Sequence, residues 1–427
     1  MTTDTSTVDT RRSRRALVAG SVGNFVEWYE FGAYGFFATV IAANFFSPTG
    51  AGDAESLIKT YASFALAFFF RPIGAAVFGR IGDRIGRRPT LILVLLLMTG
   101  ATTLIGLLPT YAAIGAAAPW ILTGVRALQG LSAGGEFGGA VSIMTEFAPR
   151  EKRGLYGSWQ SFTVALGLLA GAGLAAVLAS VLSEAALKDW GWRVPFLLAL
   201  PLGLVALYLR LKLDETPSFQ RAAKAPPQPA GETAKAIGLG VGRLMGWSAA
   251  GYTFLVVLPS YLQSSLNATF QQALIATVLA NLGFALSIIP AGLLSDRIGR
   301  RPVMVTGAAL IVVLAIPLMN GLQDKGISNG TKGLMVLLAG AVVGLLAGPG
   351  PAMLAEMFPT SVRYTGLGLA YSLSNAVFSG SAGLIITELI KRTKNVDIPA
   401  YYVMATCAIS VLALLTLRAD HRRELRD

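Results

Sequence analysis

Apolar residues run through this chain in blocks of about 20, and short charged or proline-containing loops separate them. A block of about 20 apolar residues, wound as a helix, spans the hydrocarbon core of a bilayer. The blocks are Leu17–Phe46, Leu57–Phe78, Leu91–Leu108, Trp120–Phe147, Leu155–Leu182, Val194–Leu209, Ile237–Leu262, Leu274–Leu293, Val303–Leu322, Leu334–Met357, Leu367–Ile390 and Tyr401–Leu417. The pattern therefore predicts an all-α membrane protein with twelve transmembrane helices.

The composition supports this class and excludes several others. Hydrophobic residues make up 54% of the chain and charged residues 14%, against about a quarter charged in a soluble domain. The single cysteine, Cys407, and the single histidine, His421, leave no disulfide, no Cys/His metal site and no histidine-based catalytic pair. No phosphate-binding loop of an ATP-driven pump is present. We expect no enzymatic activity, no metal and no cofactor.

Basic residues indicate the orientation in the membrane. The net charge is +12, but Lys and Arg are spread between the apolar blocks instead of forming one face, which argues against nucleic acid as a partner. Most of them lie in the two tails and in the loops that follow the second, fourth, sixth, eighth and tenth spans, and all of these segments fall on one side of the membrane. By the positive-inside rule, both termini are predicted to be cytoplasmic in a multi-pass protein of the cell (inner) membrane.

An internal repeat divides the chain into two parts. The segment Gly79–Pro89 returns as Gly292–Pro302, half the chain length later, with Asp-Arg-Ile-Gly-Arg-Arg-Pro in both copies. Such a repeat predicts two six-helix bundles related as parallel repeats, the arrangement of a rocking transporter. The predicted units are an amino tail at 1–16, a first bundle at 17–213, a proline-containing linker at 214–236, a second bundle at 237–417 and a carboxyl tail at 418–427.

Both copies of this loop resemble the signature loop of the major facilitator superfamily. Further segments are similar to the metabolite:H+ symporter family within it: Gly23–Tyr34, Phe70–Gly74, Arg126–Glu136, Lys152–Gly154, Trp190–Phe196, Asp214–Phe219 and Ala355–Gly366. The resemblance implies a proton-coupled symporter that imports a small carboxylate-bearing metabolite, either an organic acid or a zwitterion such as proline or betaine, by alternating access. One departure is Glu30, where the family usually has Asp.

The resemblance also implies a gate at the cytoplasmic ends of the helices. Its residues in this chain would be Asp83, Arg84, Arg87, Arg88, Asp296, Arg297, Arg300 and Arg301. A second repeated motif, a Glu followed seven residues later by an Arg, adds Glu146 and Arg153 in the first half and Glu356 and Arg363 in the second to the expected gate. We expect Asp83 to approach the start of the eleventh span near Tyr364 and Thr365, because helix amino ends favour anions. We also expect Arg153, together with an arginine of the 84–88 run, to bridge Glu146.

Among the charges within the predicted spans we single out five, all in the first half: Glu27, Glu30, Arg71, Arg126 and Glu136. Each costs on the order of 3 kcal/mol near the bilayer centre, so such residues usually carry function. The three glutamates are the predicted proton carriers, and the alternative is that Glu27 or Glu136 only neutralises an arginine. Asn24, Glu27, Glu30 and Tyr34 share one helix face, which we predict to line a cavity.

Substrate contacts are predicted from both halves. Arg126 is the candidate carboxylate clamp, because a guanidinium matches a carboxylate with two donors; Arg71 could do the same or could snorkel toward the membrane surface. The remaining predicted substrate-binding residues are Asn24, Tyr34, Gln129, Gln160, Tyr252, Tyr371 and Asn375. The segment Gly348–Pro351 should kink the tenth span.

A second function remains open from the sequence alone. A proton-driven exporter of amphipathic or cationic compounds could use the same fold, and three acids against two bases do not decide between the two. The expected partners are a small-molecule substrate, protons and the lipid bilayer, for a protein acting as a monomer. The sequence does not identify the metabolite.

Overall fold

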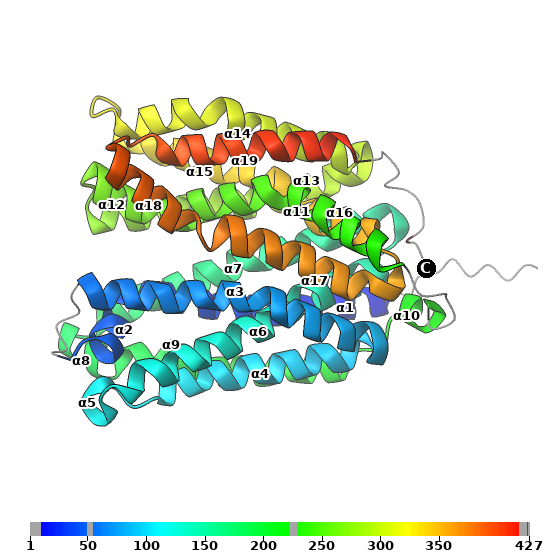
Figure 1. The fold of residues 1–427 in the computed structure, drawn as a ribbon, viewed down its shortest axis with the longest axis horizontal. Coiled ribbons are helices and arrows are strands. Elements are labelled where there is room, and N and C mark those ends of the chain that lie inside the picture. Colours follow the sequence, from blue (N-terminus) through cyan, green and yellow to red (C-terminus); the bar gives the residue numbers. More distant parts are fainter. Residues whose placement is uncertain (1–9, 49–53, 223–228, 418–424, 426–427) are drawn as a thin grey trace, which may run out of the picture.

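The computed structural model describes residues 10–48, 54–222, 229–417 and 425, and every regular element in that part of the chain is a helix. Parts of the predicted amino tail, linker and carboxyl tail, with His421, lie outside the described residues. The helices form two bundles that lie side by side (Figure 1). The predicted all-α membrane fold is confirmed.

The first bundle holds the elements up to the linker. They are α1 (Thr10–Phe36), α2 (Ala38–Ile41), η1 (Ala42–Phe46), α3 (Ala54–Ile85), α4 (Arg87–Leu107), α5 (Tyr111–Ile114), α6 (Ala117–Glu146), η2 (Arg150–Lys152), α7 (Arg153–Val181), α8 (Glu184–Asp189), η3 (Gly191–Arg193) and α9 (Val194–Leu211). The short helix α10 (Pro217–Ala222) follows in the linker.

The second bundle repeats this order with more interruptions. Its elements are α11 (Ala230–Tyr252), η4 (Thr253–Val257), α12 (Leu258–Leu266), α13 (Phe270–Ile298), α14 (Arg300–Gln323), α15 (Asn329–Ala347), α16 (Gly350–Met357), η5 (Thr360–Val362), α17 (Arg363–Ser374), η6 (Asn375–Ser379), α18 (Ala382–Thr393) and α19 (Ile398–Leu415).

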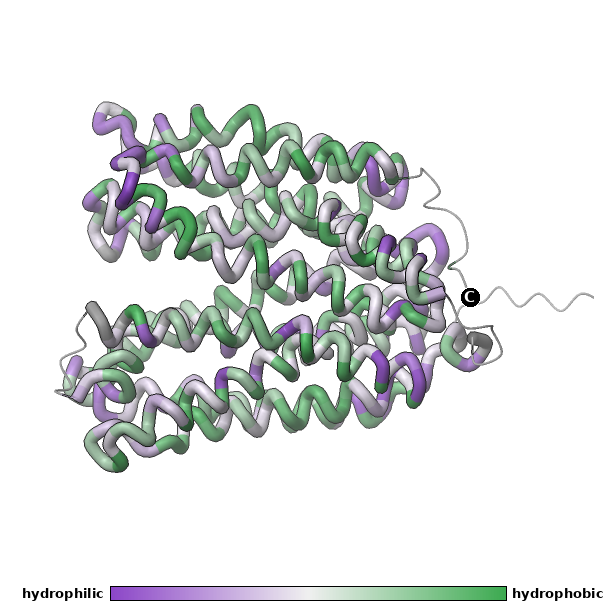
Figure 2. The backbone as a smooth tube through the Cα atoms, in the orientation of Figure 1, coloured by the Kyte–Doolittle hydropathy of each residue, from purple (hydrophilic) through white to green (hydrophobic). Residues whose placement is uncertain are grey.

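Hydrophobic and hydrophilic residues occupy different parts of the bundles. Hydrophobic positions cover the long helices, and hydrophilic ones gather at their two ends and at a few points inside the first bundle (Figure 2). Ten helical stretches of the described chain are long and apolar enough to cross a membrane. The helices α1 and α6, of 27 and 30 residues, lie outside that group because they carry the buried charges and many glycines, and they pack lengthwise in the first bundle.

Several spans are broken near their middle. The tenth span breaks between α15 and α16 at Gly348 and Pro349, as predicted, because proline has no amide to donate. The π-helical turns η4 and η6 interrupt the seventh and eleventh spans, which the hydropathy pattern did not predict. Such π-helical turns are frequent at functional sites.

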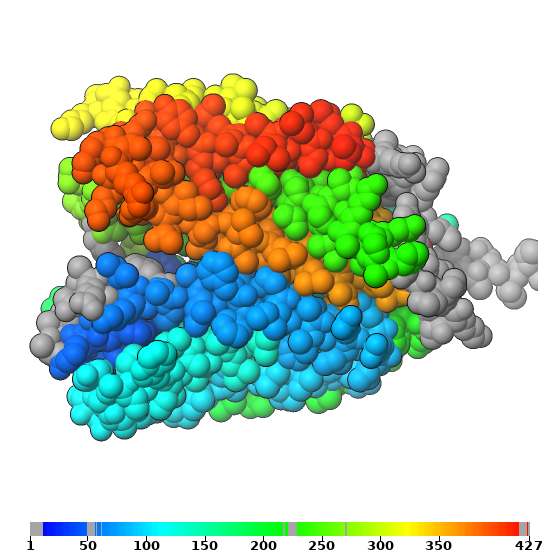
Figure 3. Space-filling model, in the orientation of Figure 1, coloured from blue at the N-terminus to red at the C-terminus, as the bar shows by residue number. Residues whose placement is uncertain are grey.

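The two signature loops are tight turns of the same kind. Gly86 has φ +125° and Gly299 has φ +101°, values that side chains rarely tolerate. Each turn joins two antiparallel helices, α3 to α4 and α13 to α14. The bundles touch along α3 and α17 toward the end that holds these turns, and they part toward the opposite end (Figure 3).

Candidate substrate and proton site

A cavity lies between the two bundles. The first bundle contributes Trp28 and Ser161, and the second contributes Trp247, Ser248, Tyr252, Tyr371, Asn375 and Ser379, among others. Tyr252, Tyr371 and Asn375 were predicted to contact substrate, and the structure places all three in this wall. The π-helical turns η4 and η6 also border the cavity, since Val256 belongs to η4 and Ser379 to η6.

The polar stripe of α1 does not line this cavity, which corrects the sequence interpretation. Asn24 donates hydrogen bonds to the Gln160 carbonyl oxygen and to Thr163, both at 2.8 Å, and Tyr34 bonds Ser63 at 2.6 Å. The stripe faces the interior of the first bundle. Trp28 lines the cavity instead, because it follows Glu27 in the sequence and projects from the helix about 100° away from it.

Glu27 and Arg71 form a buried ion pair directly behind that wall. The Glu27 carboxylate lies 3.0 Å from Arg71 Nη2, and both side chains are almost fully buried. The Arg71 guanidinium also lies 5.2 Å from the Trp28 ring centre and 4.5 Å from that of Phe68, within cation–π range. Arg71 therefore points into the protein and does not snorkel.

Glu30 and Arg126 occupy a second buried layer. Arg126 donates to Gln129 at 2.7 Å, and Gln129 donates to Thr102 at 3.2 Å. Neither Glu30 oxygen accepts a hydrogen bond of normal geometry from the described residues, although the Thr102 hydroxyl and the Arg126 charge act on it. The guanidinium of Arg126 lies 4.1 Å from the Tyr34 ring centre, and Arg126 is fully buried and does not line the cavity.

Glu136 pairs with a residue that the sequence analysis missed. Arg210, in the last turn of α9, is 1% exposed, donates to Glu136 and gives a further hydrogen bond of 2.6 Å to the Leu91 carbonyl oxygen. The apolar block ends at Leu209, so hydropathy alone leaves Arg210 outside the sixth span. The signal was the apolar pair that follows it, Leu211 and Leu213, which extends the span past the arginine.

Gly23 leaves the space that this pair occupies. A Cβ atom there would lie 1.7 Å from Arg210 Nη2 and 2.7 Å from Glu136 Oε1. Gly23→Ala should therefore displace the guanidinium and lower the stability of the protein by about 3–5 kcal/mol, the cost of a broken buried pair. Thermal unfolding in detergent measures this. Gly35→Ala, on the same helix with nothing within 4 Å, is the control and should unfold like the wild type.

The signature loops reach across to the opposite bundle. Asp83 accepts hydrogen bonds from the Tyr364 and Thr365 amides at 3.1 and 3.0 Å and from the Thr365 hydroxyl at 2.7 Å. Its counterpart Asp296 accepts from the Gly154 and Leu155 amides at 2.7 and 2.8 Å. Each aspartate thus caps the amino end of a helix in the other bundle, and the predicted contact of Asp83 is confirmed.

Glu146 is also bridged across the bundles, and the predicted partner was wrong in part. Arg363 donates to it at 2.8 Å, and Arg87, from the predicted 84–88 run, lies at 3.5 Å. Arg363 holds the place that we had expected for Arg153. Arg153 instead interacts electrostatically with Glu356. Arg300 forms an ion pair with the same glutamate at 2.9 Å.

The other signature arginines lie outside this network. Arg84 and Arg297 are exposed, and Arg301 is half-buried. Arg88 bonds the Leu211 carbonyl oxygen at 2.7 Å within its own bundle. The linker contributes what the sequence did not indicate: the Thr216 hydroxyl donates to Glu146 at 2.5 Å, and the Phe219 ring lies 4.9 Å from the Arg87 guanidinium.

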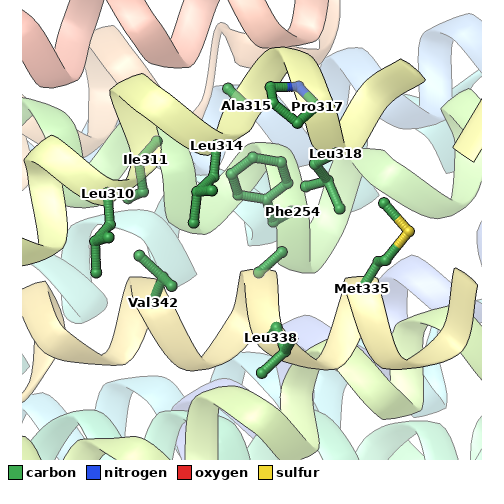
Figure 4. Close-up of a pocket in the computed structure, with 11 residues that line it drawn as sticks. Phe254, Leu310, Ile311, Leu314, Ala315, Pro317, Leu318, Met335, Leu338 and Val342 are labelled. Carbon is green, nitrogen blue, oxygen red and sulfur yellow. The ribbon is translucent and has the colours of Figure 1, made fainter. Parts of the chain in front are cut away.

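Another pocket lies between α14 and α15 and differs in chemistry. Figure 4 shows apolar side chains on all sides, with Phe254, Leu314, Leu318 and Met335 among them. Leu314 is 45% exposed, so the pocket opens on the outer surface of the bundle. It offers no group that could bind a charged solute, and the cavity between the bundles is the candidate substrate site.

Two parallel bundles around a central cavity, with ionisable groups buried beside it, define a membrane transporter. The sequence matches the sugar (and other) transporter family over residues 16–238 and the Major Facilitator Superfamily over residues 243–426. The chain belongs to the major facilitator superfamily and, within it, to the metabolite:H+ symporter family.

Several curated relatives align over nearly the whole chain. It is 33% identical over 439 residues to the proline/betaine transporter of Escherichia coli (strain K12), covering 99% of this chain and 87% of that protein. It is 34% identical over 441 residues, with the same coverage, to the glycine betaine/proline/ectoine/pipecolic acid transporter OusA of Dickeya dadantii (strain 3937). The inner membrane metabolite transport protein YhjE of Escherichia coli (strain K12) is 35% identical, covering 96% and 95%.

A solved structure shows the same fold. The proton:xylose symporter XylE, bound to 6-bromo-6-deoxy-D-glucose, superimposes with a TM-score of 0.82 over 98% of both chains at 18% identity. The twelve-helix fold in two bundles, predicted from hydropathy and the repeat, and its assignment to the major facilitator fold, which the resemblance implied, are thereby confirmed. The relatives are named as transporters, and this protein is a transporter and not an enzyme.

Proposed function

We propose that this protein is a proton-coupled symporter that imports a small carboxylate-bearing solute by alternating access. The signature loops and both termini would face the cytoplasm, in the cell (inner) membrane. Relatives of similar length are named for proline, betaine and ectoine, which favours a zwitterion over a dicarboxylate. A single chain encloses the central cavity, so a monomer suffices for the cycle.

The observation that carries the proposal is the Glu27–Arg71 pair beside Trp28. While Glu27 is ionised, it neutralises Arg71, and an anion in the cavity gains little from the guanidinium. Once Glu27 takes up a proton, Arg71 is left as a buried charge without its counter-charge, which is costly. A solute carboxylate can then replace that counter-charge. Proton and solute therefore favour each other's binding, as symport requires.

The charges of this pair reach the cavity wall. The Arg71 guanidinium lies 5.2 Å from the ring centre of Trp28, which lines the cavity, and 4.5 Å from that of Phe68, which meets the cavity residue Tyr252 edge to face. The pair lies behind one layer of aromatic rings, where water is excluded and the interaction is little screened. A change in its net charge is therefore felt by a solute in the cavity.

The remaining acids have other assignments in this proposal. Glu30, buried without full hydrogen bonds, is the candidate for a second proton-binding group. Glu136 holds Arg210 in place. With Arg210 included, the buried arginines Arg71, Arg126 and Arg210 equal in number the buried glutamates Glu27, Glu30 and Glu136. A net-neutral interior favours a zwitterion, whereas an exporter of cations calls for an excess of acids.

Uptake into proteoliposomes tests the proposal. Radiolabelled proline, glycine betaine, citrate and 2-oxoglutarate are offered separately under a gradient that is acidic outside. We expect one or more of the zwitterions to accumulate above its external concentration and the outside medium to become more alkaline as it does so. Accumulation that is unaffected by collapsing the pH gradient with an ionophore would contradict proton coupling. Efflux of a cation preloaded into the vesicles, driven by the same gradient that is acidic outside, would favour the exporter.

A further inference from the structure

Three aromatic side chains, Trp247, Tyr252 and Tyr371, line the cavity from the second bundle. The ring centres of Trp247 and Tyr371 are 5.7 Å apart and their planes are inclined at 53°. Rings that meet at such an angle form a corner whose walls are electron-rich π faces.

Contacts behind the rings hold each of them in place. Tyr371 stacks on Phe137 with centres 3.6 Å apart and planes inclined at 4°. Tyr252 meets Phe68 edge to face at 5.3 Å. Trp247 lies against Gly350, where a Cβ atom would come within 2.8 Å of its indole. The corner is therefore preorganised, and a ligand need not order these side chains when it binds.

The cavity wall carries no charge among the described residues that line it. Glu27, an acid of the first bundle, is paired with Arg71 behind Trp28. A cation in the corner would therefore be held by π faces and not by a carboxylate. A quaternary ammonium suits this environment because it has no N–H group that needs an acceptor.

We propose that Trp247, Tyr252 and Tyr371 form a binding corner for the ammonium end of a zwitterionic solute, with a preference for a fully methylated ammonium. This inference rests on the proposed function for the other end of the solute, which places the carboxylate toward Arg71. The solute then lies across the cavity, with its positive end on the second bundle and its negative end toward the first. A dicarboxylate is disfavoured, since its second carboxylate would face the negative faces of the rings.

Equilibrium binding to the purified full-length protein in detergent tests the corner without any pH gradient. The probes are glycine betaine and 3,3-dimethylbutanoate, which has the same shape and the same carboxylate but a carbon atom in place of the charged nitrogen. We expect the wild type to bind glycine betaine roughly 10- to 30-fold more tightly. Trp247→Leu and Tyr252→Leu should remove most of this preference, mainly by lowering the affinity for glycine betaine.

Two matched variants separate the corner from general effects on the fold. Tyr252→Phe keeps the π face and should keep the preference. Trp159→Leu removes an aromatic ring that packs on Phe162 and does not line the cavity, and it should also keep the preference. Thermal unfolding of each variant confirms that it is folded.

The outcomes are distinct from those of the transport assay. Equal affinity of the wild type for both probes, binding of neither, or an equal loss for both probes in the two leucine variants would overturn the corner. If glycine betaine is preferred but uptake ignores the pH gradient, the corner stands and proton coupling fails. If uptake is proton-driven but the preference is absent, the symport proposal stands and the corner fails.

Discussion

Glu27→Gln is expected to abolish accumulation of the solute under a pH gradient while exchange of solute across the membrane continues. Glutamine keeps the size of the side chain but cannot release a proton, so Arg71 lacks its counter-charge at every stage. The variant should behave as a carrier that is permanently loaded with its proton, one that binds the carboxylate and still moves between its two states. Gradient-driven uptake and counterflow, measured in the same proteoliposomes, separate the two activities.

Two further glutamate variants sharpen this test. Glu136→Gln leaves Arg210 without its counter-charge and should lower the unfolding temperature of the protein. Glu27→Gln should lower the unfolding temperature less, because Arg71 retains three aromatic neighbours. Glu30→Gln reports on the other buried carboxyl. Normal accumulation by Glu27→Gln together with failure of Glu30→Gln would move the coupling site to Glu30.

The fold was predictable because the bilayer imposes a simple rule on the sequence. Without water in the hydrocarbon region, backbone amides must be satisfied within the helix, so long apolar blocks predict spans. The repeated signature loop then fixed the parallel relation of the bundles, because Gly86 and Gly299 serve the same tight turn. The contact between Asp83 and α17 followed from the same repeat and from the helix dipole.

The limits of the sequence interpretation have physical causes as well. Arg210 looked like a loop residue because hydropathy cannot distinguish an arginine that leaves the membrane from one that turns inward to an acid. The face of α1 that meets the cavity carries Trp28 and not the polar stripe, since polar residues can serve the interior of their own bundle. The π-helical turns η4 and η6 have no hydropathy signature, because they change the backbone and not the composition.

The crossed pairing of the gate was hidden for a different reason. Glu146 and Arg153 are only seven residues apart in the sequence, which suggested a pair within the first bundle. The structure instead joins Glu146 to Arg363 across the bundles. A pair within one bundle would be equally strong in every state of the cycle. A pair between bundles breaks when they separate, so only the crossed arrangement can bias the resting state.

Asp83→Asn is expected to shift the resting protein toward the state that is open at the predicted cytoplasmic end, by roughly tenfold or more. The charged carboxylate accepts three hydrogen bonds from Tyr364 and Thr365 of the other bundle. Hydrogen bonds to charged groups contribute about 1.5–3 kcal/mol each, and about 1.4 kcal/mol changes a population ratio tenfold. A cysteine at Ser158, fully buried where α7 meets α13, reports the opening in a Cys407→Ser background.

The direction of the shift is read from two reporters and one control. In Asp83→Asn, a thiol reagent should modify Ser158→Cys faster than in the parent, and Val256→Cys, an exposed position of the cavity wall in η4, more slowly. Arg84→Gln removes an exposed charge from the same loop and should leave both rates near those of the parent. Faster labelling at both positions would indicate general loosening of the protein. Unchanged rates would mean that the contact with α17 does not hold the bundles together, and the gate would then depend on Glu146.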